Sequence, residues 1–342
     1  MRFGTATEAI ENLPRLASRG GLRRKINICT QSTAEAELAS AQKLNARFIA
    51  FGEAQYSPAL AAIDHAPPLL CVRGHANLMV KPAVAIVGAR NASAAGNKLA
   101  RVLADSLSQA GYVIVSGMAR GIDTSAHHGS LSAGTVAVLA GGIDHIYPKE
   151  NEDLYHKIAD QGALVSEQPI GIAPQARDFP RRNRIISGLA RGVVVIEASE
   201  RSGSLITAQF ALEQGREVFA VPGSPLDPRS RGANRLIRDG AALIESADHI
   251  LEVLEMLDSK KIKEDDLSHP NFEEAQSRKV DDEAIDRAHS ILEDLLSPTP
   301  IFVDELIRQS GEPTAAILAA ILELELAGKI ERHAGGQVSR PD

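Results

Sequence analysis

From about Lys81 onward, short apolar runs alternate with helical patterns and with turns that contain glycine. The run Ala83–Val87 is followed by a turn at Gly88 and by a helical pattern over residues 94–109. Further apolar runs span residues 112–115, 136–139, 163–165, 192–196 and 217–221. Continuous Val- and Ile-rich runs of this length are typical of strands buried on both faces of a parallel sheet. The pattern predicts an α/β fold with a doubly wound, mostly parallel sheet over residues 59–256.

The segments on either side of this predicted domain have different patterns. Residues 1–58 contain two helical patterns and one short strand, and they predict a small, mainly helical N-terminal region. Residues 257–280 are polar and charged without sustained periodicity, which predicts a linker. Residues 281–342 predict a winged-helix domain: helices over 282–296, 302–309 and 313–327, then two short strands around Gly335-Gly336.

Composition and charge narrow the class of protein. The 342 residues carry a formal net charge of −7, but this charge is unevenly divided. Residues 1–240 carry a net +6 (27 Lys/Arg, 21 Asp/Glu), and residues 241–342 carry −13 (10 Lys/Arg, 23 Asp/Glu). Two distant cysteines exclude a disulfide scaffold and a cysteine-based zinc site. The absence of a long apolar run and of a secretory pattern at the N-terminus predicts a cytoplasmic protein that contacts no membrane.

Four loops that follow predicted strands are rich in Gly, Ser and Arg. They cover residues 88–93, 116–123, 179–184 and 201–208. Ligands of open α/β sheets bind beyond the carboxyl ends of the strands, and free N–H groups at helix starts attract phosphates. For each loop a purely structural interpretation also stands, such as a tight turn, a helix cap at Asp123 or Ser204, or a solvated charge run. Four such loops together favour binding of a phosphate backbone, with low sequence specificity and strong salt dependence.

Other chemistries find less support in the sequence. The G-x-G-x-x-G spacing is missing, and Ser116-Gly117 stand where a dinucleotide site would need a carboxylate. No P-loop, G-x-S-x-G elbow, H-E-x-x-H stretch or metal cluster occurs. His127 and His128 are adjacent on a predicted helix and point in different directions, so His127 is interpreted as a hydrogen-bonded structural residue. We therefore expect no catalysis, no cofactor and no metal.

Several stretches of residues 56–245 closely resemble the DNA-processing protein A family (DprA, also called Smf). They include Ile86-Val87-Gly88-Ala89-Arg90, Ser116-Gly117-Met118-Ala119-Arg120-Gly121-Ile122-Asp123, Phe179-Pro180-Arg181-Arg182-Asn183-Arg184 and Ser202-Gly203-Ser204-Leu205-Ile206-Thr207-Ala208. The resemblance implies an extended Rossmann-like fold and binding of single-stranded DNA without sequence preference. It also implies a homodimer that loads RecA recombinase onto strands imported during natural transformation, with single-strand-binding protein as a further partner. The alternatives are a Rossmann-type nucleotide-processing enzyme, similar to a nucleoside-monophosphate phosphoribohydrolase, and a regulator that acts only by protein contact.

Carried over by motif, the resemblance places a set of residues in the DNA pocket. They are Gly88, Ala89, Arg90, Ser116, Gly117, Arg182, Asn183, Arg184, Ser202, Gly203 and Ser204, with Phe179 as a candidate stacking residue and Arg181 in a variable position of its motif. Replacing Arg90, Arg182 and Arg184 by Ala is expected to flatten the salt dependence of binding by about one unit per lost phosphate contact.

The sequence departs from the family at both ends. Many members begin with a longer helical domain similar to a SAM or helix-hairpin-helix domain, of which only the later part is expected here. The third helix of the predicted winged helix is apolar and acidic, where a DNA-reading helix needs Arg, Lys or Asn. We therefore expect this domain to serve protein contact or stability rather than DNA reading.

Overall fold

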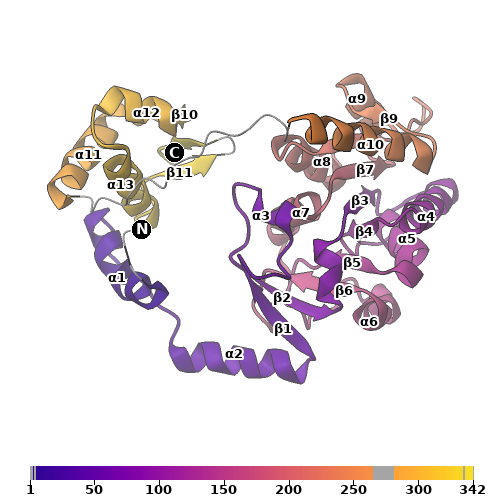
Figure 1. The fold of residues 1–342 in the computed structure, drawn as a ribbon, viewed down its shortest axis with the longest axis horizontal. Coiled ribbons are helices and arrows are strands. Elements are labelled where there is room, and N and C mark those ends of the chain that lie inside the picture. Colours follow the sequence, from indigo (N-terminus) through magenta and orange to yellow (C-terminus); the bar gives the residue numbers. More distant parts are fainter. Residues whose placement is uncertain (1–2, 4, 265–280, 334–335, 342) are drawn as a thin grey trace. The chain divides into compact units, whose positions relative to one another are not determined.

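The computed structural model of the protein describes residues 3, 5–264, 281–333 and 336–341. The chain divides into two compact units. We call Gln31–Ser268 the sheet unit, and Met1–Thr30 together with His269–Asp342 the terminal unit. Figure 1 shows the elements of both.

A nine-stranded sheet forms the centre of the sheet unit, in the order β1-β2-β6-β5-β4-β3-β7-β8-β9. The strands are β1 (Ala46–Ala50), β2 (Leu69–Gly74), β3 (Ala83–Gly88), β4 (Val113–Ser116), β5 (Thr135–Val138), β6 (Ala163–Ser166), β7 (Gly192–Ile196), β8 (Glu217–Ala220) and β9 (Ala242–Leu243). In the order of the sheet, all neighbouring strands from β6 through β5, β4, β3, β7 and β8 to β9 pair in parallel. The pairs β1 with β2 and β2 with β6 are antiparallel. The prediction of an extended, mostly parallel sheet is confirmed.

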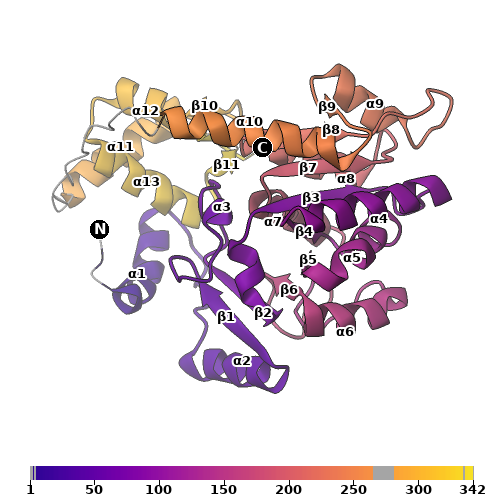
Figure 2. The ribbon, with the colours of Figure 1, turned by 45° about the vertical axis from the view of Figure 1, so that its right-hand side comes forward.

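Successive side chains of a strand point to opposite faces of the sheet. Helices cover both faces, so side chains of both sets are buried. In β3, Val84 and Ile86 belong to one apolar core, and Ala85 and Val87 belong to another. The first core includes side chains of α4 (Ala94–Gln109), α5 (Ile122–Ser130) and α10 (Ala247–Glu264); the second includes α3 (Pro58–Ala61), α7 (Asp178–Leu189) and α8 (Gly203–Glu213). Figure 2 gives a second view of these layers. A third core joins β1 and β6 to α2 (Gln31–Lys43) and α6 (Glu152–Gln161).

The sequence pattern missed some elements. The strand β2 has only three fully buried positions, and β9 and α9 (Arg231–Arg238) are short, so none shows a clear period. The helix α10 continues to Glu264 and thus includes the first residues of the predicted linker. Lys and Glu are good helix formers, so a charged segment without an apolar face can still extend a helix. The rest of that linker, residues 265–280, lies outside the described residues.

The terminal unit contains the winged helix that the sequence predicts. Its elements are α11 (Asp282–Leu295), α12 (Val303–Ser310), α13 (Thr314–Leu326) and a small sheet of β10 (Ile301–Phe302), β12 (Gln337–Ser339) and β11 (Glu331–His333). Of the predicted Gly335-Gly336 turn, Gly335 lies outside the described residues. Buried apolar side chains from all three helices and from β12 form the core of this winged helix.

The helix α1 (Ala6–Arg19) also belongs to the terminal unit, although it lies at the other end of the chain. Arg19 donates to Asp282 and to Asp286, each at 2.7 Å, and its Nε lies 3.3 Å from Glu323. The Glu323 side chain is fully buried, and it also contacts His289 at 2.8 Å. Since a buried carboxylate needs charged or hydrogen-bonding partners, Arg19 ties α1 to α11 and α13. The predicted N-terminal region 1–58 therefore contributes α1 to one unit and α2 and β1 to the other.

Candidate nucleic-acid interface

A groove runs along the carboxyl ends of β3, β4 and β7, where the sequence analysis placed its Gly/Ser/Arg loops. It consists of two adjoining pockets of about 470 and 830 Å³ that share Arg90, Ala119, Tyr147, Phe179 and Arg182. Of the predicted site residues, Gly88, Ala89, Arg90, Gly117, Phe179, Arg182, Asn183, Ser202, Gly203 and Ser204 line it. The topology thus brings together loops that are more than 100 residues apart in the sequence.

The first loop supplies an exposed cation to this groove. Arg90 has no ion pair within the described residues, and its guanidinium lies 5.4 Å from the centroid of the Phe179 ring. A guanidinium over an aromatic face is stabilised there while its N–H groups stay available to a phosphate. Gly88 lines the groove and also has a packing role, since a Cβ atom there would lie 1.9 Å from the carbonyl oxygen of Ile196. This glycine allows β3 and β7 to pack.

The start of α4 is already occupied by a carboxylate. Glu197 accepts a hydrogen bond from the amide of Ser93 at 2.8 Å and another from the Ser93 hydroxyl. In dinucleotide-binding Rossmann folds, the corresponding helix start holds the pyrophosphate. The anion at the start of α4 is thus a carboxylate of the protein itself, and binding of a phosphate by the N–H groups after Gly88 stays a prediction. A negative charge at this position also disfavours a bound dinucleotide.

The second loop, residues 116–121, is held by buried polar side chains. The hydroxyl of Ser116 is fully buried and donates to the carbonyl of Ile86 at 2.6 Å, so it faces the sheet and not the groove. The carboxylate of Asp123 accepts from the amides of Gly117 (3.1 Å) and Ala119 (3.3 Å). Burial raises the pKa of Asp123 to about 6, against the opposing effect of Arg182. Asp123 therefore organises the loop that precedes its own helix.

The structure supports the structural interpretation of His127. Its ring is fully buried, and Nδ1 lies 2.9 Å from the hydroxyl of Thr135. That hydroxyl donates to the carbonyl of Ile114, so Nδ1 carries the proton that it shares with Thr135. Burial lowers the pKa of His127 to about 3, which keeps the ring neutral.

The arginines of the third loop lie within the first turns of α7, and they differ in exposure. Arg182 is 7% exposed and donates to the carbonyls of Gly117 (2.6 Å) and Val138. Arg184 is also largely buried and pairs with Glu167 at 2.5 Å, while the more exposed Arg181 lies 3.5 Å from the same carboxylate. Neither Arg181 nor Arg184 lines the groove, because Glu167 holds both of them.

The fourth loop opens the helix α8 beside the larger pocket. Ser202 is the N-cap residue, and its hydroxyl lies 2.7 Å from the hydroxyl of Ser204. Gly203 is exposed, and no atom of the described residues lies within 4 Å of the position that a Cβ would take. The amide of Asn183 donates to the carbonyl of Gly203 at 3.3 Å, which fixes α7 against this helix start. Free N–H groups at a helix start, with hydroxyls beside them, can hold a phosphate oxygen.

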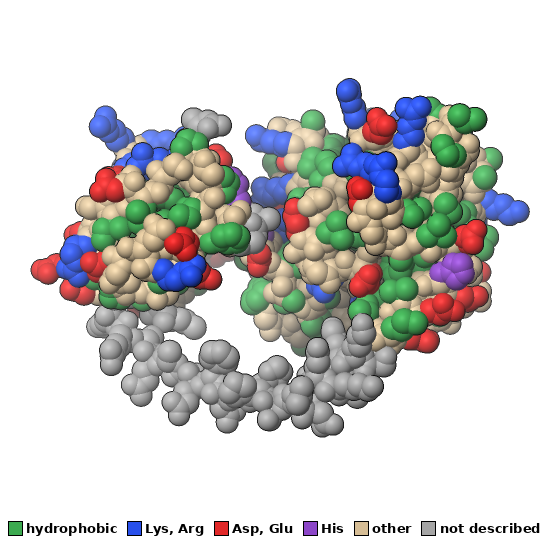
Figure 3. Space-filling view, turned by 90° about the horizontal axis from the view of Figure 1, so that it is seen from above, with side chains coloured by type: hydrophobic (Ala, Val, Ile, Leu, Met, Phe, Trp, Pro, Cys, Tyr) green, Lys and Arg blue, Asp and Glu red, His purple; other side chains and the backbone are tan. Residues whose placement is uncertain are grey.

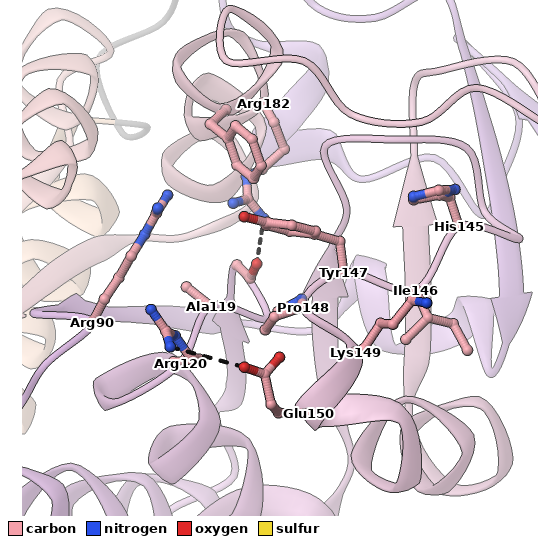
Figure 4. Close-up of a pocket in the computed structure, with 12 residues that line it drawn as sticks. Arg90, Ala119, Arg120, His145, Ile146, Tyr147, Pro148, Lys149, Glu150 and Arg182 are labelled. Atoms are coloured by element: carbon pink, nitrogen blue, oxygen red, sulfur yellow. Dashed lines mark hydrogen bonds and ion pairs between the residues drawn. The ribbon is translucent and has the colours of Figure 1, made fainter.

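Several residues that line the groove were not predicted as site residues, among them Tyr147, Arg120, Lys149 and Arg229. Tyr147 is half exposed, and its ring centroid lies 5.4 Å from that of Phe179. Arg120, Lys149 and Arg229 add positive charge; Arg120 lies 3.8 Å from Glu150, and Arg229 pairs with Asp227 at 2.8 Å. Figure 4 shows Arg90, Arg120 and Arg182 directed toward one pocket. The stretch Tyr147-Pro148 was a usable signal, since an exposed aromatic after a strand of the sheet suits contact with a base.

The described residues contain no group of three or more His, Cys, Asp or Glu side chains placed to hold a metal ion. Among the same residues, no helix is long and apolar enough to cross a membrane. On the face drawn in Figure 3, acidic and basic side chains are interspersed over both units.

Comparison with known proteins gives matches along most of the chain. Residues 47–255 match the family model of DNA recombination-mediator protein A, residues 276–336 match a DprA winged helix domain, and residues 1–40 match a DprA-like N-terminal HHH domain. Protein Smf of Escherichia coli is 40% identical over 296 residues, which cover 83% of this chain and 74% of that protein. The DNA processing protein DprA of Bacillus subtilis is 46% identical over 220 residues, which cover 64% of this chain and 74% of that protein.

Two solved structures are similar to the fold. The X-ray structure of DprA from Streptococcus pneumoniae has a TM-score of 0.64 and 38% identity, and the match covers 72% of this chain and 90% of that chain. A structure described as revealing the single-stranded DNA binding mode of DNA processing protein A from Helicobacter pylori has a TM-score of 0.56 and 28% identity. That match covers 61% of this chain and 96% of the other.

Proposed function

The chain belongs to the DNA recombination-mediator protein A (DprA) family, and from this premise we propose that it binds single-stranded DNA in the groove of the sheet unit. The strand contacts Arg90, Arg120 and the start of α8 through its phosphates. Because these contacts are made to the backbone, binding is independent of sequence.

One observation carries the proposal: the groove combines exposed cations, the open amide of Gly203 at the start of α8 and two aromatic rings. Arg90 lies over the Phe179 ring, and the Tyr147 ring packs against the same ring at a centroid distance of 5.4 Å. Gly203 leaves the start of α8 open toward the larger pocket. Single-strand binding proteins use this combination, a positive groove for the backbone and aromatic rings for the bases. Ser116, Arg181 and Arg184 stand outside the proposed contact surface because of their burial or their pairing with Glu167.

We propose that the biological role follows that of the family. The chain would load RecA recombinase onto single strands taken up during natural transformation, as a cytoplasmic homodimer and alongside single-strand-binding protein. The support for these partners is the family membership together with a strand-binding groove. Loading is tested by the rate at which RecA forms filaments on DNA coated with single-strand-binding protein, with and without this chain.

We propose further that the groove catalyses nothing. The carboxylate of Glu197 at the start of α4 takes the position of a nucleotide phosphate, which disfavours a nucleotide-processing site of Rossmann type. Incubation with nucleoside monophosphates is expected to release no free base. Release of base by the wild-type protein at a rate above that of the buffer would contradict the proposal.

The binding proposal is tested by fluorescence anisotropy of labelled oligonucleotides over a salt series. Wild-type protein is expected to bind oligo-dT and a mixed single strand alike, and a duplex of the same length more weakly. Arg90→Ala is expected to lower the slope of log K against log salt by about one unit. Arg101→Ala, an exposed arginine of α4 outside the groove, is the matched control and should leave the slope unchanged. Equal binding of duplex and single strand, or an unchanged slope for Arg90→Ala, would contradict the proposal.

A further inference from the structure

The loop 116–121 lines the groove through Gly117, Ala119 and Arg120, and its backbone adopts an unfavourable conformation. Met118 has φ +62°, in the left-handed region that a side chain disfavours. Such a conformation costs of order 1–3 kcal/mol, so it persists only where neighbouring groups determine it. The contacts of this loop therefore show what determines the shape of this wall of the groove.

Two buried side chains from other elements hold the backbone carbonyls of the loop. Arg182 of α7 donates to the carbonyl of Gly117 at 2.6 Å and also to that of Val138, so it bridges the ends of β4 and β5. Asn151, which precedes α6, donates to the carbonyl of Met118 at 2.8 Å. Arg182 and Asn151 are 7% and 6% exposed.

The same loop is held from within by its own helix. The carboxylate of Asp123 accepts the amides of Gly117 and Ala119, and the hydroxyl of Thr124 donates to the carbonyl of Ala119 at 2.8 Å. No space remains between these groups. A Cβ atom at Gly117 would lie 2.7 Å from an Arg182 nitrogen and 2.8 Å from an Asp123 oxygen.

These contacts engage most of the Arg182 guanidinium within the protein, so at most its second terminal nitrogen is available to a phosphate. One terminal nitrogen is engaged by two carbonyls, and Nε is buried without a hydrogen-bond partner within the described residues. Its charge faces Asp123, which is itself 6% exposed. Arg90, in contrast, is exposed and has no ion pair among the described residues.

We propose that Arg182 and Asn151 are positioning residues: they fix the loop 116–121 in the shape that receives the strand, and neither contacts a phosphate. The inference rests on the proposed function and changes the role expected for Arg182 from the sequence. It also gives Asn151, which no motif of the sequence indicates, a role in binding DNA.

The salt series separates a positioning residue from a contact residue, because the slope of log K against log salt reports the number of neutralised phosphates. Asn151→Ala changes no charge, and it is expected to weaken binding about tenfold at every salt concentration, since the loop must then be ordered during binding. Arg182→Ala is expected to behave in the same way. The Arg90→Ala variant is the contrast, with its slope lower by about one unit.

Two readouts exclude a general loss of structure. Circular dichroism at the assay temperature should show each variant folded, and hydrogen exchange should rise in residues 116–121 while β3 and β7 stay protected. Asn151→Ala keeps the test open if Arg182→Ala fails to fold. Lys157→Ala, on the exposed surface of α6 and outside the groove, is the matched control and should bind like wild type.

The outcomes are distinct. A slope for Arg182→Ala that falls as far as that of Arg90→Ala would show a direct phosphate contact and overturn the inference. Wild-type affinity for Asn151→Ala would overturn it as well. A wild-type protein that binds no single strand at any salt concentration would instead overturn the proposed function, and the inference with it.

Discussion

The two glycines Gly88 and Gly203 both border the groove, but an added methyl group should affect them in opposite ways. At Gly203 the part of the chain that the structure describes leaves the space within 4 Å of the Cβ position empty, so Ala fits there. Replacing Gly by Ala in a compatible conformation stabilises a protein by about 0.4–1 kcal/mol, through the unfolded chain. Gly203→Ala should therefore keep or slightly raise the free energy of unfolding.

Binding of the strand should respond differently. As the first residue of α8, Gly203 has an amide N–H without an intrahelical acceptor. A hydrogen bond from such an amide to a charged phosphate contributes about 1.5–3 kcal/mol. If the methyl group keeps a phosphate from this amide, the affinity should fall by at least about tenfold, since about 1.4 kcal/mol corresponds to a factor of ten.

Gly88→Ala provides the contrast, because its Cβ atom would lie 1.9 Å from the carbonyl oxygen of Ile196. The strands β3 and β7 must then move apart, and overpacking of this kind costs about 1–3 kcal/mol of folding stability. The assays are urea denaturation and anisotropy with labelled oligo-dT, and Gln209→Ala on the exposed face of α8 is the control. Unchanged DNA affinity in Gly203→Ala would show that the strand does not approach the start of α8, and the reasoning would be wrong.

Three further predictions concern stability and the terminal unit. Since the pKa of His127 is lowered to about 3 in the folded protein, only the unfolded chain takes up this proton as the pH falls below about 6.5. This proton uptake should therefore make the free energy of unfolding about 2 kcal/mol lower at pH 5 than at pH 7. Urea denaturation of His127→Gln should show a correspondingly weaker pH dependence. A pH dependence identical to that of the wild type would contradict a neutral, buried His127. Arg19→Ala removes a partner of the buried Glu323 and should destabilise the terminal unit by about 2 kcal/mol. The measurement is denaturation followed by hydrogen exchange of α13. The control variant Arg15→Ala replaces an exposed arginine of α1 and should leave the stability of the terminal unit unchanged. Deletion of residues 270–342 should leave single-strand affinity in the salt series nearly unchanged, because the apolar and acidic α13 offers little to DNA; a sharp loss would show that the winged helix takes part in binding.

The sequence predicted the sheet because its signal is local. Each strand from β3 to β8 is a short Val-, Ile- or Ala-rich run, and the parallel order then places the following loops at one edge. The same logic placed Arg90 and Gly203 correctly on the groove. It failed for α10, where polar residues continue a helix that the pattern ended near Leu257.

The individual roles within the site depended on contacts that no local pattern contains. Arg184 and Arg90 look alike in the sequence, yet Glu167 pairs with Arg184 from the end of β6. Glu197 has φ +50° and turns its carboxylate toward the start of α4. The position of this residue after an apolar run does not predict that conformation. The spacing of a motif in the sequence predicts which loop carries a charged side chain. Whether that side chain is available to a phosphate depends on its partners from other elements.

The ion pairs of Arg19 also constrain the order in which the protein folds as it is synthesised. Arg19 leaves the ribosome 263 residues before Asp282, its partner at 2.7 Å. At ordinary translation rates of about 5–20 residues per second, that interval is on the order of tens of seconds. The sheet unit lies wholly between the two residues in the sequence. It can therefore fold before the carboxylates that pair with Arg19 have been synthesised. On this account, α1 is the first helix to be synthesised and among the last to pack in the folded protein.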